Sequence, residues 1–285
     1  MAIKTILAPA LDGDEAALEA AFALAKTHQA HVEVLQVSAD PKESIAYLGE
    51  GMTGAMVEQV LASVERDNAA REAKARAAFA DLVKRHDAVV ADKAGQAIGL
   101  TACFKSVVGR DEAVIPERSR LFDVLVVPRP GPDGASQTRV AVEAALLGSG
   151  RAVLLVPPGP VKPIGKIVAV AWNGSLEAAR AIRLGGVVMR GAERVVVMSA
   201  AEKGRKSRAE DLVDALAWHG RKAEALTLDV GKKRVGQALL ERAAQEGADL
   251  LIMGAYTHSR FRELVFGGAT SDALASATIP VVMVH

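Results

Sequence analysis

Cysteine and aromatic residues are scarce in this chain of 285 residues, which contains one cysteine and only 4% Phe, Trp and Tyr. A single cysteine excludes an intrachain disulfide framework and a zinc site built from several cysteines, and it is typical of a reducing cytosol. Its setting, Leu-Thr-Ala-Cys-Phe at residues 100–104, predicts a buried strand. We therefore expect Cys103 to be a small apolar core residue without chemistry of its own.

The chain also lacks an excess of charge and any long apolar run. A net charge of +1 gives no global field that would attract nucleic acid or an anionic membrane. No apolar run approaches the roughly 18 residues of a membrane span, and the first residues lead directly into a strand. We therefore expect a cytoplasmic protein that binds neither nucleic acid nor membrane.

Several common catalytic motifs are missing. No Gly-x-Gly-x-x-Gly follows the first strand, and no Gly-x-Ser-x-Gly is present, which argues against a dinucleotide-dependent dehydrogenase and an α/β-hydrolase. Gly231-Lys232-Lys233 lacks the first glycine and the Ser or Thr of a phosphate-binding P-loop, so we interpret it as a charged turn. The six histidines show no metal-ligand spacing on one helix face.

The chain does contain a long internal repeat. Residues 3–13 and 164–175 are apolar runs that end in Asp-Gly and Asn-Gly, and each precedes an alanine-rich stretch that predicts a helix, at 15–26 and 176–189. The period of roughly 160 residues indicates duplicated domains and not a solenoid. With half of its residues apolar, the chain is long enough for two cores.

Both halves continue as strands alternating with helices. Continuous Val, Ile and Leu runs are typical of parallel strands covered on both faces, and right-handed crossovers then make a doubly wound domain. We predict an α/β fold of two tandem doubly wound domains with mainly parallel five-stranded sheets. The first is expected at residues 1–156, a proline-rich linker at 157–163 and the second at 164–285. A helix over about 56–86 is an insertion, either a solvated cover or a partner-binding surface.

The most informative segment is residues 248–285. An apolar run ends on Gly254, a basic loop carries His258, Arg260 and Arg262, and Gly267-Gly268 opens a predicted helix. Glycines at both ends of a loop, the second at a helix start, suggest an anion cradle in which backbone N–H groups and the helix dipole favour a phosphate. This pattern predicts a nucleotide site in the C-terminal half.

The second half resembles the universal stress protein family. The likeness lies in Ala-Trp-Asn-Gly-Ser at 171–175, the run at 249–256, the loop at 258–270 and the closing strand at 279–284. It covers the whole chain as two tandem copies, but it is sharp only in the second copy. The resemblance implies an adenine nucleotide alpha-hydrolase-like fold and ATP, with or without Mg²⁺, as the ligand.

Nucleotide-binding members of that family carry a glycine, two residues, a glycine, nine residues, a glycine and then Ser, Thr or Asn. Gly254 and Gly267 match the first and third glycines, whereas Thr257 and Gly268 depart from the pattern. A β-branched Thr257 permits neither positive φ nor close ligand approach easily, but Gly268 keeps its backbone N–H. The hydroxyls nearest to the helix start are those of Thr270 and Ser271.

The resemblance also implies a base pocket after the first strand of the second half. Asn173 stands where an acidic residue commonly lies, and its amide both donates and accepts. Trp172 either shields the sheet edge or contacts the ligand, and Met198 and Met253 either touch the base or belong to the core. The full set of expected nucleotide-binding residues is Ala171, Trp172, Asn173, Met198, Met253, Gly254, Thr257, His258, Arg260, Gly267, Gly268, Ala269, Thr270 and Ser271.

Individual side chains of the basic loop have two interpretations each. His258 either contacts a phosphate or packs on Phe261, and Arg260 and Arg262 either neutralise phosphates or are solvated. The corresponding segment of the first half, 128–136, is short and rich in proline, which removes N–H donors. We therefore predict that the first half binds no nucleotide, although Asp12 occupies its base-pocket position.

These observations predict a nucleotide-dependent stress-response protein that binds ATP in its C-terminal domain. No catalytic residue is assigned, because Glu263 and Asp272 have no partner fixed by the sequence, and turnover would be slow hydrolysis or self-phosphorylation at most. An unknown protein partner is expected, as is a homodimer or an intramolecular pseudo-dimer that pairs residues 152–156 with 281–284.

Two alternatives stay open. The first is a nucleotide-free interaction module in which Thr257 and Gly268 mark a decayed site. The second is an enzyme acting on a small molecule in a pocket of the first half.

Overall fold

Two successive copies of a strand–helix alternation make up the structure, a computed structural model that describes residues 2–13, 15–46, 53–95, 98–131, 136–200, 209–256 and 268–285. The first half contains β1 (Thr5–Pro9), α1 (Glu15–His28), β2 (His31–Ser38), α2 (Pro41–Ala46), α3 (Gly54–His86), β3 (Val89–Val90), β4 (Thr101–Val108), α4 (Asp111–Ser119), β5 (Val124–Pro128), α5 (Gln137–Gly148) and β6 (Ala152–Val156). The second contains β7 (Ile167–Ala171), α6 (Leu176–Gly185), β8 (Arg194–Ala200), α7 (Ala209–Ala217), β9 (Glu224–Leu228), α8 (Val235–Gln245), β10 (Leu250–Gly254), α9 (Gly268–Ser276) and β11 (Val281–Val284).

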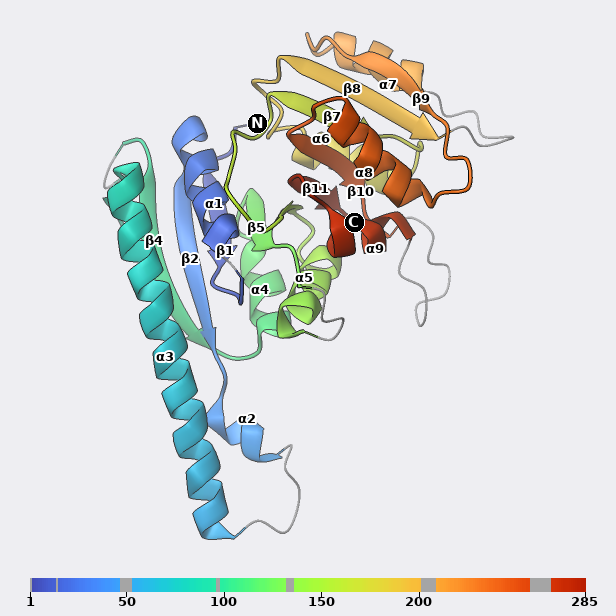
Figure 1. Cartoon of the computed structure of the whole chain (residues 1–285). Coiled ribbons are helices and arrows are strands. Elements are labelled where there is room, and N and C mark those ends of the chain that lie inside the picture. The colour runs from blue at the N-terminus through green and yellow to red at the C-terminus, as the bar shows by residue number, and fades with distance from the viewer. Residues whose placement is uncertain are drawn as a thin grey trace.

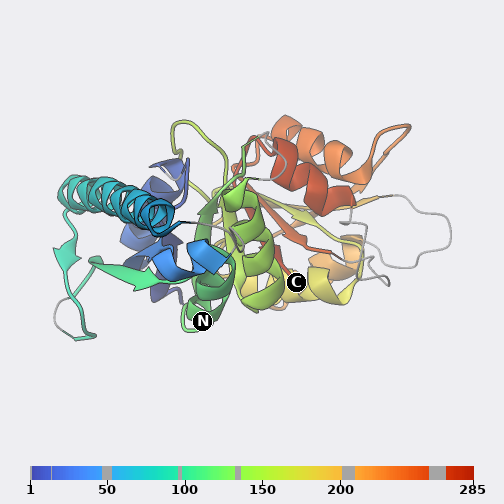
Figure 2. The ribbon, with the colours of Figure 1, turned by 90° about the horizontal axis from the view of Figure 1, so that it is seen from below.

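All of these strands belong to one 11-stranded sheet in the order β3-β4-β2-β1-β5-β6-β11-β10-β7-β8-β9. Neighbours are parallel except β6 and β11, which pair antiparallel with Leu155 opposite Val281 and Val153 opposite Met283. This junction joins the two halves side by side (Figures 1 and 2) and confirms the pairing expected from the sequence. The predicted α/β fold is confirmed, but the two expected sheets form one continuous sheet and the first half adds the short edge strand β3.

The sheet separates two apolar cores. Residues from α1, α3, α6 and α7 pack in one core, and residues from α4, α5, α8 and α9 pack in the other. The central strands β5 and β6 are buried along their whole length, which is why their sequences are unbroken apolar runs and do not alternate with polar residues.

The duplication extends to individual hydrogen bonds. A carboxylate of Asp123, just before β5, accepts the backbone N–H groups of Lys4 and Thr5 at 2.8 and 3.0 Å. Asp249 holds the same place before β10 and accepts from Gly165 and Lys166 at 2.7 and 3.1 Å. Each aspartate thereby fixes the start of the first strand of its own half, because a charged acceptor strengthens bonds from backbone donors.

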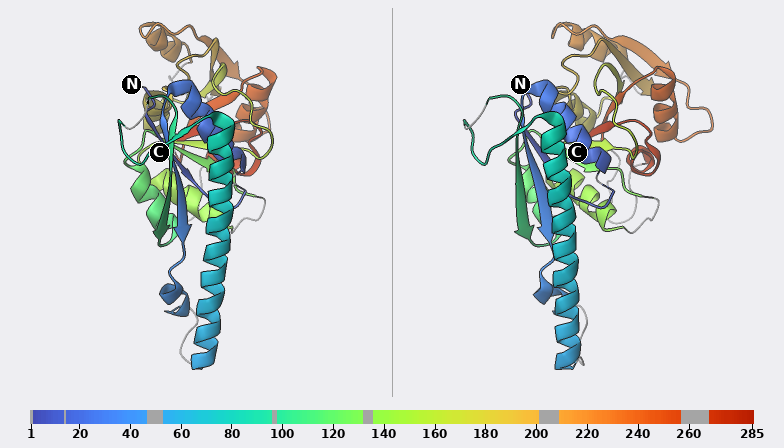
Figure 3. Two further views of the ribbon diagram at one scale, coloured as in Figure 1. Left: turned by 90° about the vertical axis from the view of Figure 1, so that its left-hand side faces the viewer. Right: turned by 60° about the vertical axis from the view of Figure 1, so that its left-hand side comes forward.

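The first half differs from the second in its 33-residue helix α3. This helix begins after the cap Thr53, ends at Asp87 in a left-handed conformation, and projects well beyond the end of the sheet with α2 beside it (Figure 3). The helix predicted over 56–86 is confirmed. The sequence pattern missed α2 and β3, because six and two residues are too few to show a hydrophobic period.

The helix expected at 176–189 is shorter in the structure, where α6 ends at Gly185. Arg221 donates to the carbonyls of Gly186 and Met189 in the turn that follows. Cys103 is 2% exposed on β4, so its burial is confirmed. Among the described helices, none has the length and apolar character that a membrane span requires.

Candidate functional site

The candidate site of the second half lies at the carboxyl ends of the adjacent parallel strands β7 and β10. From β7 the chain crosses through α6 to β8 on one side, and from β10 it crosses through α9 to β11 on the other. This is the topological switch point of the half-sheet, where doubly wound proteins bind their ligands in the crevice beyond the strand ends. Figure 1 shows α9 beside the end of β10.

The end of β7 is fixed by bonds to β8. Ala171 lies opposite Met198 in the parallel register, and the N–H of Trp172 donates to the Met198 carbonyl at 2.8 Å. The Ser199 hydroxyl in turn donates to the Trp172 carbonyl at 2.9 Å. The Trp172 indole is half-buried against the core, and its buried Nε1–H finds no acceptor among the described residues. An unpaired buried donor is costly, so this N–H is a destabilising feature of the strand end.

Asn173 is exposed just beyond the strand. Its Oδ1 accepts the N–H of Ser175 at 3.1 Å, and Ser175 caps α6 by accepting the N–H of Ala178 at 3.1 Å. Gly174 between them has a φ of +70°, a conformation that glycine adopts without strain. The Asn173 amide therefore shapes the turn with its oxygen, and its Nδ2 keeps its capacity to donate.

Gly254, the last residue of β10, is explained by packing. A Cβ at this position would stand 2.6 Å from the Ala178 nitrogen and 2.7 Å from the Glu177 carbonyl carbon. The first turn of α6 therefore approaches β10 so closely that only glycine fits. Gly254, the first glycine of the sequence motif, therefore allows the first turn of α6 to pack directly against β10.

The segment after β10 is tied to α9. The N–H of Tyr256 donates to the Thr270 hydroxyl oxygen at 3.0 Å, and Thr270 is 2% exposed. Tyr256 has a φ of +59°, unusual for a residue with a large side chain, and its ring lies edge-on to His285 with the centroids 5.9 Å apart. The Thr270 hydroxyl thus ties the backbone just after β10 to the first turn of α9.

The start of α9 leaves one residue open. Gly268 is exposed and an added Cβ would meet nothing within 4 Å, whereas Ala269 packs against Gly236 of α8 and Ser271 is half-buried. The first N–H groups of a helix have no intrahelical acceptors and carry the positive end of its dipole. The first turn of α9 can therefore receive an anion at Gly268.

The two candidate methionines belong to the core. Met198 is 0% exposed and Met253 is 4% exposed, and both pack in the core shared with α8 and α9. The remaining expected site residues, Thr257, His258, Arg260 and Gly267, lie outside the described residues, as do Phe261, Arg262 and Glu263.

Sequence reasoning missed an ion pair beside α9. The Arg234 guanidinium, just before α8, lies 2.5 Å from a carboxylate oxygen of Asp272, whose side chain is 1% exposed. Because 64% of the Arg234 side chain is exposed, the buried aspartate anchors a cation that still faces solvent near the start of α9. The two residues are too far apart in sequence for any pattern to connect them.

The described residues fit a phosphate better than a metal ion. The open first turn of α9 and the anchored Arg234 provide N–H donors and a positive charge. By contrast, no group of three His, Cys, Asp or Glu side chains within the described ranges could hold a metal. The buried Asp272 carboxylate lies 2.5 Å from the Arg234 guanidinium.

Comparisons with known proteins agree with this architecture. Residues 166–285 match the model of the universal stress protein family. No curated protein sequence matches the chain significantly.

Three solved structures illustrate the likeness. A universal stress protein from Archaeoglobus fulgidus DSM 4304 is 17% identical, with a TM-score of 0.63 over 98% of this chain and 95% of that one. A putative universal stress protein from Pseudomonas aeruginosa UCBPP-PA14 is 12% identical, with a TM-score of 0.52 over 99% and 93%. A universal stress protein in complex with cAMP is 16% identical over 55% of this chain and 98% of that one, but its TM-score of 0.32 is too low to support an argument.

The strand order and the switch point define a doubly wound α/β protein, and the two full-length structural matches share this fold over nearly the whole chain. Through its match at residues 166–285, the second half of the chain is similar to the universal stress protein family.

Proposed function

We propose that this protein binds an adenine nucleotide, ATP in the first instance, at the switch point of its C-terminal half and acts as a nucleotide-dependent regulator in a stress response. The observation that carries the proposal is the meeting of Asn173, Gly254 and the open first turn of α9 at the carboxyl ends of β7 and β10. Parallel α/β sheets bind ligands at this place, because the strand order reverses there and leaves a crevice.

In this proposal the phosphates of ATP bind at the first turn of α9. Gly268 is exposed at the first turn of α9, where the helix dipole favours a negative charge. Arg234 adds a positive charge whose position is fixed by the buried Asp272. An anchored guanidinium loses less conformational freedom on binding than a free surface arginine, so it favours phosphate binding more strongly.

In the same proposal the adenine base lies near the carboxyl end of β7. The exposed Asn173 amide lies beside that strand end, and its Nδ2 can donate to the acceptor ring nitrogens of adenine. Met198 and Met253 are core residues behind that strand end, so the proposal assigns them no direct contact with the base. The proposal is one of binding and orientation, and it assigns no step of ATP hydrolysis to the described residues.

Residue 268 offers a matched pair of variants. Gly268→Ser places a hydroxyl at the start of α9 without a steric cost, because an added Cβ has open space. Gly268→Asp places a carboxylate there, which suits the helix dipole but repels a phosphate. We expect the serine variant to bind ATP more tightly, by about tenfold for about 1.4 kcal/mol, and the aspartate variant to bind it more weakly by at least as much.

Calorimetric titration of the full chain with ATP, with mass spectrometry of nucleotide extracted from the purified protein, is the test. Unchanged thermal unfolding of both variants is the folding control. If the protein neither carries nor binds adenine nucleotide at millimolar concentration, the proposal is wrong.

Replacing Thr257 by glycine then tests the alternative of a decayed site. Binding gained only in that variant favours the nucleotide-free interaction module, for which the projecting helix α3 is the exposed surface (Figure 3). We further propose that the two halves form an intramolecular pseudo-dimer through the β6–β11 pairing and that two whole chains form a homodimer. We also propose that the protein is cytoplasmic.

A further inference from the structure

The outer face of α3, the side turned away from the sheet, is exposed along the whole helix. The inner face packs on the first half of the chain through the buried Ala75 and Leu82 and the partly buried Phe79. On the opposite face the residues that recur every three or four positions, from Ala55 to Lys84, are all exposed. A helix of 33 residues is about 50 Å long, and the N-terminal part of α3 extends beyond the sheet (Figure 3). This face is therefore long enough to receive another helix.

Five exposed charges of α3 lack an ion pair, and they are divided by sign along the helix. The N-terminal part carries Glu58, Glu65 and Asp67, and the C-terminal part carries Lys74 and Lys84. None of the five has an ionic partner within the part of the chain that the structure describes. The two other acidic residues of the C-terminal part are paired with arginines one turn later. A second copy of this helix that runs in the opposite direction is therefore complementary in charge.

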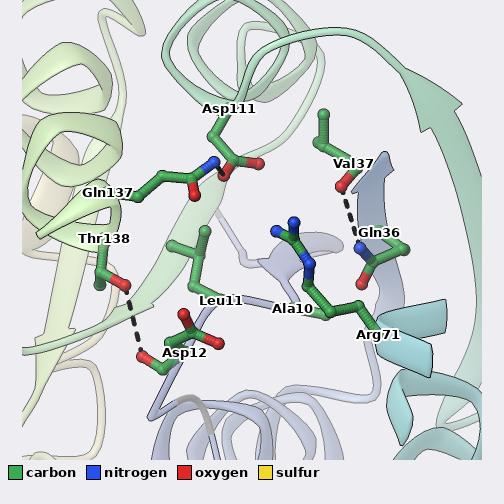
Figure 4. Close-up of a pocket in the computed structure, with 9 residues that line it drawn as sticks. All are labelled: Ala10, Leu11, Asp12, Gln36, Val37, Arg71, Asp111, Gln137 and Thr138. Atoms are coloured by element: carbon green, nitrogen blue, oxygen red, sulfur yellow. Dashed lines mark hydrogen bonds between the residues drawn. The ribbon is translucent and has the colours of Figure 1, made fainter. Parts of the chain in front are cut away.

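Two other arginines of α3 have interactions within their own chain. The Arg66 Nε donates to the Ala62 carbonyl at 3.0 Å, one turn earlier in the helix. Arg71 points toward the first half of the chain and lines a small polar pocket with Asp12 and Asp111, at the carboxyl ends of β1 and β2 (Figure 4). The Arg71 charge is thus directed to carboxylates of its own chain and away from the outer face.

The outer face is also self-complementary in the positions of its small residues. Ala62 and Ala80 lie nine residues on either side of residue 71, and Ala69 and Ala73 lie two residues on either side of it. Because 18 residues make about five turns, these four exposed alanines share one side of the helix. An antiparallel copy related by a twofold axis at residue 71 places alanine against alanine, so the two helix axes can approach to about 8 Å.

The same axis brings the unpaired charges of opposite sign together. Asp67 and Lys74 lie four and three residues from residue 71, on one side of the helix, so each meets the other residue of the second copy. Glu58 and Lys84 are each thirteen residues from residue 71, so they come within reach of each other in the same way. Every such contact occurs twice because the pair is symmetric. A parallel arrangement would place like charges side by side.

We propose that the outer face of α3 is a dimerisation surface and that its partner is α3 of a second copy of this chain, in antiparallel orientation with the twofold axis near residue 71. Since each helix projects beyond its own sheet, the bodies of the two copies lie at opposite ends of the helix pair (Figure 3). This gives the proposed homodimer its interface. The interface is specific to the first half, because the equivalent helix α7 of the second half has 9 residues.

Exchange of the charges at residues 67 and 74 tests this arrangement. Asp67→Lys places a lysine against Lys74 of the second copy, and Lys74→Asp places an aspartate against Asp67 of the second copy, in each case at both symmetric contacts. Side chains that pair within one helix are three or four residues apart, whereas these two are seven apart. Restored association in the double variant therefore reports on a contact between two copies.

The measurement is sedimentation equilibrium of the full chain from micromolar to hundred-micromolar concentration. We expect the parent to dimerise and each single reversal to weaken the dimer at least about tenfold, since two attractions become two repulsions. The double variant, and an equimolar mixture of the two single variants, should associate as the parent does. Glu117→Lys, at an exposed residue of α4, is the matched charge-reversal control and should leave the dimer unchanged. Circular dichroism verifies folding of every variant.

Three results would overturn the inference: a parent that stays monomeric at hundred-micromolar concentration, a dimer that is indifferent to both single reversals, or a dimer that neither the double variant nor the mixture restores. The proposed nucleotide site lies in the other half of the chain, so the single variants should bind ATP as the parent does. A parent that dimerises as expected but binds no ATP contradicts the proposed function and leaves this interface intact.

Discussion

Replacing Asp111 by asparagine should stabilise the protein at neutral pH, because the native carboxylate is charged where burial disfavours charge. Burial raises its pKa from 3.8 to about 6 in the folded chain. Since each pKa unit corresponds to about 1.36 kcal/mol, the ionised side chain costs the native state up to about 3 kcal/mol. Asparagine has a similar shape, carries no charge, and can still accept the hydrogen bond from Gln137.

The sign of the pH dependence follows from the raised pKa. Between about pH 4 and pH 6 the folded chain holds the Asp111 proton more tightly than the unfolded chain, so this residue makes stability fall as the pH rises through that window. Below the window both states are protonated and the cost disappears. The asparagine variant should therefore gain about 2 to 3 kcal/mol near pH 7 and nothing near pH 4.

Urea unfolding of both proteins at several pH values measures this difference directly. Asp123→Asn is the matched control, since that carboxylate accepts two backbone N–H groups and its loss should destabilise the fold by about 1 to 3 kcal/mol. A variant at residue 111 that is no more stable than the parent at neutral pH, or whose gain does not change with pH, would refute the reasoning.

Three further predictions concern single residues. Gly254→Ala should cost more than about 2 kcal/mol in thermal unfolding, because the new Cβ would clash with the α6 backbone, whereas Gly268→Ala should stay within about 0.5 kcal/mol; equal effects would contradict the packing argument. Thr270→Val leaves the Tyr256 N–H without its acceptor and should cost about 1 to 3 kcal/mol by denaturant unfolding, with Thr270→Ser restoring most of it. Burial raises the pKa of Cys103 to about 11, so its thiol should react with a disulfide reagent near pH 8 only after unfolding, and rapid reaction of the folded chain would disprove its burial.

Much of the architecture could be predicted from the sequence, because buried parallel strands leave a strong signal. The unbroken apolar runs of β5 and β6 and the repeated Asp-Gly and Asn-Gly turns gave the duplicated α/β fold. The pairing of β6 with β11 was also expected from the tandem arrangement, whereas its antiparallel direction is a finding of the structure.

The chemistry of the site was less accessible to sequence reasoning. A glycine motif suggests that a ligand approaches the backbone, yet Gly254 makes room for the backbone of α6. Similarly, the Thr270 hydroxyl accepts a hydrogen bond from the Tyr256 N–H. The Arg234–Asp272 pair and the approach of Arg71 to Asp111 depend on how helices pack. Such contacts between distant residues have no periodic signature, so only the folded structure brings them together.

The central claim is that one half of this duplicated protein binds a nucleotide and the other does not. The stoichiometry of ATP binding to the full chain, measured by isothermal titration calorimetry, tests it most directly. The account predicts one ATP per chain, with the affinity raised by Gly268→Ser and lowered by Gly268→Asp. Two equivalents per chain, none at millimolar concentration, or binding indifferent to residue 268 would contradict it.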